Sequence, residues 1–383
     1  MLEILTQEQQ ADFAKRGFSR RRFHKMATLL AAGSALPFYN EQALAQRPDR
    51  PPIPADAVRI NANENPMGPC PEAAEAIHAI VPRGGRYLNE ENGAVAMLLA
   101  EQEGVKANYV TVFAGSSDPL HRAVLSFTAK DRPYVVADPG YEAGARAAEF
   151  IGAPVMRVPL VPGSFQHDVK AMVAAAPNAG LFYICNPNNP TGTITAKEDI
   201  EWLVEHKPAG SVVLIDEAYI HLSTATMSSY MVAADKDVMI LRTFSKLYGM
   251  AGLRAGAAIA KPELLARLSN YGNGMLPVTG MAGAAASLRV KTLVAERRKI
   301  IADVREDTFG FLAKNNIEFI TSYANMFMMN VKRPGQDFFN DMAAQKVMIG
   351  RVWKAWPNWV RVSVGTRDEM AKFKEACLKC YTA

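Results

Sequence analysis

The sequence predicts an α/β fold that has a large domain with a mainly parallel sheet covered by helices, plus a smaller α+β domain. From about residue 85 to residue 270, short apolar runs alternate with segments of helical periodicity. This alternation is typical of parallel strands joined by helices that cover both faces of a sheet. From about residue 290, a long charged segment with a helical pattern precedes shorter apolar runs, which indicates the second domain.

The apolar runs of the large domain are short and bounded by turn residues, as buried strands are. We expect strands at 110–113, 134–137, 181–185, 212–215, 238–241 and 255–259. Helical patterns between them include 119–127, 142–151, 197–205 and 262–270. In the smaller domain we expect a helix at 295–312, strands at 326–331 and 360–364, and a closing helix from Arg367. The segment 60–69 is expected to join this domain or to lie across the cleft.

The composition is that of an ordinary globular protein. The chain has 383 residues, of which 49% are apolar and 21% are charged, with a formal net charge of +5. No basic stripe, helix-turn-helix pattern or zinc-ligand spacing is evident, so we expect neither a nucleic-acid partner nor a metal site. Four cysteines are too few for a disulfide framework. Cys377 and Cys380 form a CxxC on the expected last helix. Two thiols on one helix face are favoured over a redox pair, and a disulfide between them remains an alternative in an oxidising compartment.

The N-terminus resembles a bacterial twin-arginine export signal. Three arginines at 20–22 precede a mildly apolar run at 26–38 and then the small residues 43–45, although His24 stands where an apolar residue is usual. The run is shorter than the roughly 20 residues that span a bilayer, so we expect no stable membrane anchor. The alternative is a basic amphipathic helix. We therefore expect recognition by the export machinery, and a mature periplasmic or secreted protein that starts near Gln46.

Four divisions of the chain follow from these patterns. Residues 1–45 are expected to be the signal peptide, and 46–84 an N-terminal arm with part of the small domain. The arm begins with four prolines between residues 48 and 54, which favours an extended, stiff conformation. Residues 85–290 are expected to form the large domain and residues 291–383 the small C-terminal domain.

Lys246 stands in the segment of the chain that is most indicative of function. Thr243 and Ser245 precede it and Arg254 follows eight residues later. A desolvated lysine amine condenses with carbonyl compounds, while hydroxyls and an arginine fork bind phosphate. The segment therefore suits a Schiff-base lysine beside a phosphate site. A solvated surface lysine is the alternative, since most lysines are of that kind.

Polar residues also follow three other expected strands. Asp216 comes directly after 212–215 and could hold a cationic ring nitrogen, or simply cap the next helix. Tyr219, three residues later, and Asn189, in the Pro-rich turn after 181–185, could both donate to a phenolic oxygen. Tyr141, after 134–137, could stack on a ring or pack in the core.

A phosphate site is also predicted where the first expected strand meets its helix. Gly115, Ser116 and Ser117 stand at this junction, just before Pro119. Backbone N–H groups at the start of a helix bind phosphate. A plain capped helix start is the alternative.

These motifs resemble those of the class I/II aminotransferases that use pyridoxal 5'-phosphate, which have fold type I, and most of all the histidinol-phosphate aminotransferases. The motifs occur in family order from residue 60 to residue 366. They are NANENP at 61–66, RY at 86–87, GSS at 115–117, PNNPTG at 187–192, DEAY at 216–219, TFSK at 243–246, GLR at 252–254 and RVSVGT at 361–366.

The resemblance implies an aminotransferase that moves an amino group between an amino acid and a 2-oxo acid through an aldimine on Lys246. It implies that Asp216 pairs with the pyridine nitrogen, that Tyr219 and Asn189 contact the phenolic oxygen, and that Tyr141 stacks on the ring. The phosphate contacts it implies are Gly115, Ser116, Ser117, Thr243, Ser245 and Arg254. Tyr87 would reach the phosphate of the neighbouring subunit in a homodimer. Arg361 would hold the substrate α-carboxylate, with Asn63 and Arg351 as further substrate contacts.

The substrate is less well determined than the reaction. Arg351 matches a family arginine that is associated with a side-chain phosphate, as in histidinol phosphate. Trp353 and Trp356 beside it could instead line a pocket for an aromatic side chain, or only pack the small domain. The expected export argues against histidinol phosphate as the substrate, because histidinol phosphate is a cytoplasmic metabolite. Other reactions on the same scaffold, namely decarboxylation, racemisation and β-elimination, stay open, whereas a non-catalytic binder is disfavoured because Lys246 and Asp216 are both present.

Overall fold

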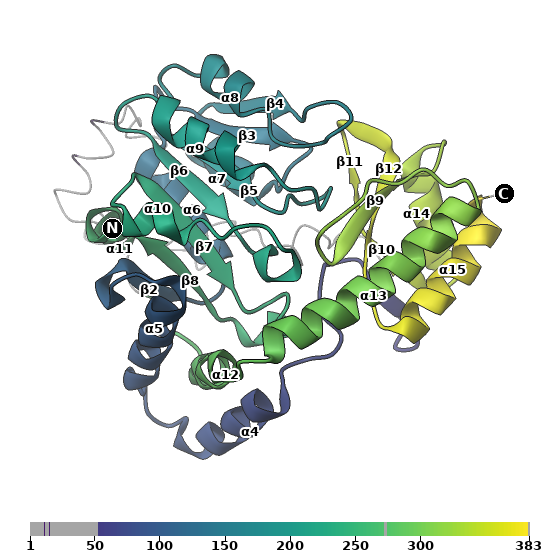
Figure 1. Cartoon of the computed structure of the whole chain (residues 1–383), viewed down its shortest axis with the longest axis horizontal. Helices are drawn as coiled ribbons and strands as arrows, with labels where there is room; N and C mark the ends of the chain where they lie inside the picture. Colours follow the sequence, from purple (N-terminus) through teal and green to yellow (C-terminus); the bar gives the residue numbers. More distant parts are fainter. Residues whose placement is uncertain (1–10, 12–14, 16–52, 272–273, 382–383) are drawn as a thin grey trace.

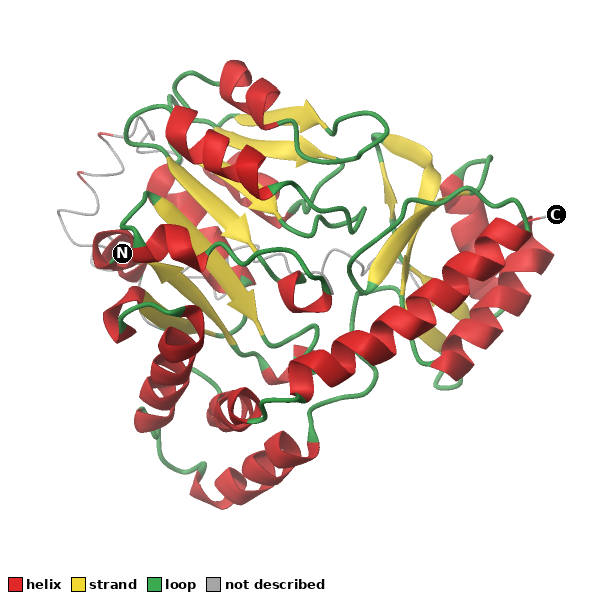
Figure 2. Ribbon diagram, in the orientation of Figure 1, coloured by secondary structure: helices red, strands yellow, loops and turns green. Residues whose placement is uncertain are grey.

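The computed structural model describes residues 11, 15, 53–271 and 274–381. Its largest element is a seven-stranded sheet in the order β2-β8-β7-β6-β5-β3-β4, with helices on both faces (Figure 1, Figure 2). The strand pairs from β4 to β7 are parallel, and β8 is antiparallel to both β7 and β2. This mainly parallel, helix-covered sheet confirms the predicted α/β fold.

The central strands of this sheet are almost wholly apolar because helices bury both of their faces. The seven strands of the sheet, with β2 and β4 at its edges, are β2 (Val110–Phe113), β3 (Tyr134–Asp138), β4 (Val155–Pro159), β5 (Leu181–Cys185), β6 (Val212–Asp216), β7 (Val238–Thr243) and β8 (Gly256–Ala260). All except β4 overlap a predicted strand. β4 is a half-exposed edge strand with a charged Arg157 in its middle, so its sequence has no continuous apolar run.

The helices of this part of the chain cover the sheet, and three of them (α4, α5 and α12) lie below β2 (Figure 1). They are α4 (Pro71–Ile80), α5 (Glu90–Glu103), α6 (Ser117–Phe127), α7 (Ala143–Ile151), α8 (Val169–Ala175), α9 (Lys197–His206), α10 (Ser229–Ala233), α11 (Pro262–Ser269) and α12 (Val278–Arg289). Short 3-10 helices are η1 (Val81–Arg83), η2 (Ala107–Tyr109), η3 (Ile220–Leu222) and η4 (Ala251–Leu253). α12 packs on α4 and α5 at the lower edge of the molecule (Figure 1).

The second part of the molecule is built on two small sheets. β11 (Val352–Trp353), β12 (Trp356–Ser363) and β9 (Met326–Asn330) form an antiparallel sheet in that order. β1 (Val58–Ile60) pairs in parallel with β10 (Val347–Ile349), so the start of the 60–69 segment belongs here. The helices are α13 (Leu293–Lys314), α14 (Gly335–Ala344) and α15 (Arg367–Tyr381), and α13 packs beside α15 (Figure 1).

The CxxC motif lies on α15, as predicted. Cys377 and Cys380 are both buried with free thiols, and burial raises the pKa of Cys377 to about 12. A thiol with so high a pKa is a poor nucleophile at neutral pH.

The three arginines, the apolar run and the cleavage site near Gln46 of the predicted export signal lie outside the described residues. Across the described part of the chain, no helix is both long enough and apolar enough to cross a membrane.

Candidate active site

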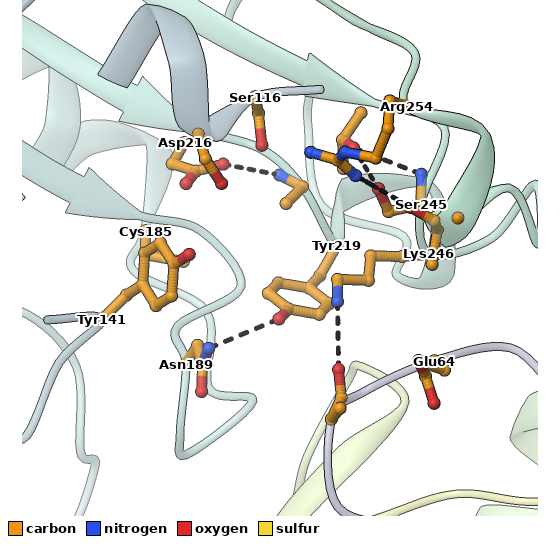
Figure 3. A pocket seen from close by; sticks show the side chains of 16 residues that line it. Glu64, Ser116, Tyr141, Cys185, Asn189, Asp216, Tyr219, Ser245, Lys246 and Arg254 are labelled. Carbon is orange, nitrogen blue, oxygen red and sulfur yellow. Dashed lines mark hydrogen bonds between the residues drawn. The ribbon is translucent and has the colours of Figure 1, made fainter. Parts of the chain in front are cut away.

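Ten of the predicted site residues come together in one cavity of about 310 Å³ at the carboxyl edge of the large sheet (Figure 3). Loops that follow β2, β3, β5, β6 and β7 supply its walls, because parallel strands end at the same edge. β8 runs the opposite way, so Arg254, two residues before its start, also reaches this edge. The predicted residues that line the cavity are Ser116, Ser117, Tyr141, Asn189, Asp216, Tyr219, Thr243, Ser245, Lys246 and Arg254.

One end of the cavity is a cluster of hydroxyls around Arg254. Its guanidinium donates to Ser245 Oγ at 3.4 Å, to the Ala251 carbonyl at 2.9 Å and to the Ala114 carbonyl at 3.0 Å. Thr243 Oγ1 donates to Ser245 Oγ at 2.9 Å. Burial lowers the pKa of Arg254, but a guanidinium remains a cation at neutral pH.

Gly115 allows Arg254 to lie against the backbone of the loop after β2. Gly115 has a φ of +90°, and a Cβ placed there would lie 2.2 Å from Arg254 Nη2. The first turn of α6, which begins at Ser117, adds backbone N–H groups that no helical carbonyl can bind. This end of the cavity therefore has the donors and the charge of an anion site, as the sequence predicted for a phosphate.

Asp216 lies at the end of β6 on another wall of the cavity and is 3% exposed. The Tyr183 hydroxyl donates to its Oδ2 at 2.8 Å, and the Ala218 N–H donates to its Oδ1 at 3.1 Å. Burial raises the pKa of Asp216 to about 6, against the lowering effect of these hydrogen bonds and of nearby Lys246. The side chain is thus a carboxylate at neutral pH, placed to pair with a cation in the cavity.

Tyr219 is held by two amides. Asn63 Nδ2 donates to its hydroxyl oxygen at 3.0 Å and Asn189 Nδ2 donates at 3.4 Å. Ser363 Oγ donates to the side-chain oxygen of Asn63 at 2.9 Å, and Arg361 Nη1 donates to that of Asn189 at 3.0 Å. The two amides are therefore fixed with their NH₂ groups toward Tyr219, which leaves its proton directed elsewhere.

Lys246 projects into the middle of this arrangement (Figure 3). Its side chain is buried, with Nζ 3.3 Å from the Ala62 carbonyl and 5.7 Å from the centre of the Tyr219 ring. Tyr141 lines the same cavity, on the side of Asn189 (Figure 3). The solvated-lysine alternative is excluded by this burial.

Arg361 and Arg351 are the two substrate contacts predicted from the smaller domain, and they differ in position. Arg361 is fully buried on β12, close to Asn189. Arg351 Nε and Nη2 both donate to Glu142 Oε2, at 3.1 and 2.9 Å. Both arginines lie close to Trp353, whose ring centre is 4.4 Å from the Arg351 guanidinium and 5.3 Å from that of Arg361.

The tryptophans pack the smaller domain rather than line this cavity. Trp353 is 2% exposed, donates from Nε1 to the Gly140 carbonyl at 2.9 Å and packs with Ile320 and Met328. Trp356 packs against the same cluster. Of the two interpretations of these rings, domain packing is the one that the contacts support.

Comparison of the sequence with known proteins identifies the family of the chain. The family model for class I and II aminotransferases matches residues 55–376. The chain belongs to the class I and II aminotransferase family. Relatives include histidinol-phosphate aminotransferase 1 of Nitrosococcus oceani, 32% identical over 83% of this chain and 87% of the relative. An aromatic amino acid aminotransferase of Cutibacterium acnes is 29% identical over 84% of this chain and 92% of the relative.

A solved structure has the same fold as this aminotransferase chain. The histidinol-phosphate aminotransferase of Sinorhizobium meliloti, in complex with pyridoxal 5'-phosphate, superposes with a TM-score of 0.80. The match covers 91% of this chain and 96% of that one, at 24% identity. This likeness confirms the fold type I architecture.

Some residues of the site could not be found from their own motifs. Glu64 and Cys185 line the cavity, and Tyr183 supports Asp216 from β5. Glu64 lies inside the motif at 61–66, and Cys185 stands two residues before the motif at 187–192. Position in or beside a motif is therefore the signal that could have identified both residues. Tyr183 is an alternate residue of a buried strand and has no such signal. Tyr87, in contrast, is 75% exposed and lies outside this cavity.

Proposed function

We propose that this chain is a pyridoxal-phosphate-dependent aminotransferase in which Lys246 is the catalytic lysine. One observation carries the proposal. The Lys246 amine, the Asp216 carboxylate and the Arg254 guanidinium with the hydroxyls around it converge on a single cavity. A cofactor with a carbonyl, a basic ring nitrogen and a phosphate needs these three partners together.

The residues fit the cofactor at each of its polar groups. Arg254, Ser245 and the N-terminus of α6 would hold the phosphate, in the anion site that Gly115 keeps open. Asp216 would hold the ring nitrogen, with Tyr141 against the ring. When bound, pyridoxal phosphate supplies a carbonyl that accepts amines and a ring that withdraws electrons from a neighbouring bond.

The chain itself supplies proton transfer and orientation. Lys246 Nζ is the base that moves a proton at the substrate Cα, which is general acid–base work by a desolvated lysine. Tyr219 would direct its hydroxyl proton at the phenolic oxygen, since both amides bound to Tyr219 donate to it. Arg361 would hold the substrate α-carboxylate, with Asn63 and Asn189 keeping the neighbouring wall in place.

The test is a spectroscopic titration of the purified enzyme loaded with pyridoxal phosphate. A panel of amino acids is added one at a time, followed by a 2-oxo acid. At least one amino acid should convert the cofactor to its amine form, and the oxo acid should restore the starting spectrum. Release of ammonia or carbon dioxide, or racemised amino acid without conversion, would instead assign a lyase, decarboxylase or racemase.

We further propose that the preferred amino donor has an uncharged side chain. The guanidinium of Arg351 is already neutralised by Glu142, and it also lies over the ring of the buried Trp353. A donor bound through its α-carboxylate at Arg361 would therefore find Arg351 in an ion pair rather than as a bare cation. The histidinol-phosphate and aromatic amino acid aminotransferases among the relatives are the two substrate classes to compare.

Glu142→Gln should shift this preference toward donors with an anionic side chain. Loss of the carboxylate leaves Arg351 as an unneutralised cation, and we expect kcat/KM for such donors to rise about tenfold relative to aromatic ones. The matched control is Glu149→Gln, which breaks the exposed Arg157–Glu149 pair of the same α7 region. Equal effects of the two variants on the ratio of kcat/KM values would remove Glu142 from the determinants of specificity.

We propose that the functional unit is a homodimer in which Tyr87 reaches the phosphate of the neighbouring subunit. Tyr87 is exposed and lies outside the cavity of its own chain. Tyrosine is enriched in protein–protein interfaces, so an interface with a second chain would account for this exposed ring. Light scattering should give the mass of two chains. A monomer with full activity would contradict the proposal.

We propose that the N-terminal residues direct the protein through the twin-arginine route to the periplasm or outside the cell. The order of three arginines, an apolar run and small residues at 43–45 supports this. Fractionation of bacterial cells that express the full chain should recover a form lacking about the first 45 residues outside the cytoplasm. Replacement of Arg20, Arg21 and Arg22 by lysine should retain the protein inside.

A further inference from the structure

Tyr183 is a fully buried tyrosine in the middle of β5, next to the strand that ends in Asp216. It is 1% exposed, and its hydroxyl donates to Asp216 Oδ2 at 2.8 Å. The other carboxylate oxygen, Oδ1, accepts the N–H of Ala218 at 3.1 Å. Asp216 therefore has one donor on each oxygen, and the plane of its carboxylate is fixed before anything enters the cavity.

The geometry points to Tyr183 as a positioning residue that acts through Asp216 on the ring nitrogen of the cofactor, an inference that rests on the proposed function. A hydrogen bond to a buried anion stabilises the charged form. It also leaves fewer orientations to the carboxylate, so that a cationic ring nitrogen meets a preorganised partner. Tyr183 touches neither substrate nor cofactor in this role.

The strand next to β5 supplies a natural comparison. Tyr134 on β3 is likewise fully buried, and its ring centre is 6.1 Å from that of Tyr183. Within the described residues its hydroxyl has no hydrogen-bond partner, and it packs against Gly144, where a Cβ would lie 2.2 Å from Tyr134 Oη. Tyr134 thus fills space in the core, whereas Tyr183 also binds a site carboxylate.

The charge of Asp216 depends on every group around it. Burial raises its pKa, while the bonds from Tyr183 and Ala218 and the amine of Lys246 act in the opposite direction. The charged or titratable groups that lie around it are Lys246, Glu217, Tyr134, Tyr183, Tyr141 and Cys185. Of these, Tyr183 is the side chain with a hydrogen bond to the carboxylate in the described part of the chain.

The experiment compares Tyr183→Phe with Tyr134→Phe in the full chain. Pyridoxal phosphate is removed and added back, and its dissociation constant is measured by protein fluorescence between pH 5 and pH 8. Tyr183→Phe should bind about tenfold more weakly at neutral pH, and its affinity should begin to fall at a higher pH than in the wild type. Tyr134→Phe should match the wild type in both respects.

A double-mutant cycle with Asp216→Asn separates positioning from packing. In the Asp216→Asn background, the loss of the Tyr183 hydroxyl should leave the dissociation constant unchanged. An equal loss of affinity in both backgrounds would overturn the inference, as would a Tyr183→Phe chain that fails to fold while Tyr134→Phe folds. Wild-type protein that does not bind pyridoxal phosphate at all would instead count against the proposed function.

Discussion

Lys246→Ala should reduce aminotransferase turnover by at least about 10³-fold. The amine of Lys246 is buried in the cavity that Asp216 and Arg254 also line, and the described residues that line it include no second lysine that could replace it as a base. The substitution removes a long side chain from the wall of an open cavity, so the fold should survive. The phosphate and ring contacts should also survive, and pyridoxal phosphate should still bind, though reversibly.

Two measurements check this prediction. Steady-state turnover is compared with that of Lys299→Ala, which removes a lysine whose side chain is 75% exposed and should behave as the wild type. Borohydride reduction of the loaded wild type, followed by peptide mass spectrometry, should locate the cofactor on Lys246. Substantial turnover by Lys246→Ala, or a label on another lysine, would show that the assignment of the catalytic lysine is wrong.

The cavity could be predicted because its residues follow a general rule of parallel sheets. Asp216, Asn189 and Lys246 each come shortly after a run of apolar residues, and such runs are buried strands. Since parallel strands end at one edge, polar residues at these points meet even when they are far apart in sequence. The same runs predicted the five central strands and the edge strand β2, but not the half-exposed edge strand β4.

Contacts between distant side chains could not be predicted in this way. Asn63 binds Tyr219 across 156 positions, and Glu142 binds Arg351 across 209. Such pairs depend on how the smaller domain sits on the large one, which no local pattern specifies. The alternation of a strand also cannot tell which of its tyrosines finds a carboxylate, so Tyr183 looks like any other core residue in the sequence.

A buried ion cluster behind the cavity is another feature that the sequence could not reveal. Arg242 on β7 donates from Nε to Glu103 Oε1 at 2.6 Å and from Nη2 to Glu103 Oε2 at 2.8 Å. Its Nη1 pairs with Glu217, the residue next to Asp216. All three side chains are at most 3% exposed. The guanidinium thus ties α5 to the loop that carries Asp216 and Tyr219.

Arg242→Met should lower the free energy of unfolding by about 3–5 kcal/mol, because it leaves two buried carboxylates without a cation. Denaturant unfolding measures the effect, and Arg157→Met, at a surface pair with Glu149, should cost less than about 1 kcal/mol. Although burial alone would raise it, attraction to Arg242 holds the pKa of Glu103 below its ordinary value of 4.5. The stabilisation is therefore present above pH 4.5 and is lost as the pH falls through the depressed value, so the two proteins should converge in acid.

The triple variant Arg242→Met, Glu103→Gln and Glu217→Gln decides what the cluster is for. Replacement of a whole buried ion cluster by neutral groups of similar size is often tolerated, so this chain should recover most of the stability lost by Arg242→Met. If its affinity for pyridoxal phosphate also equals that of the wild type, the cluster serves only the fold. Recovered stability with weakened affinity would mean that Arg242, through Glu217, holds the Asp216–Tyr219 loop in the position that the cavity requires.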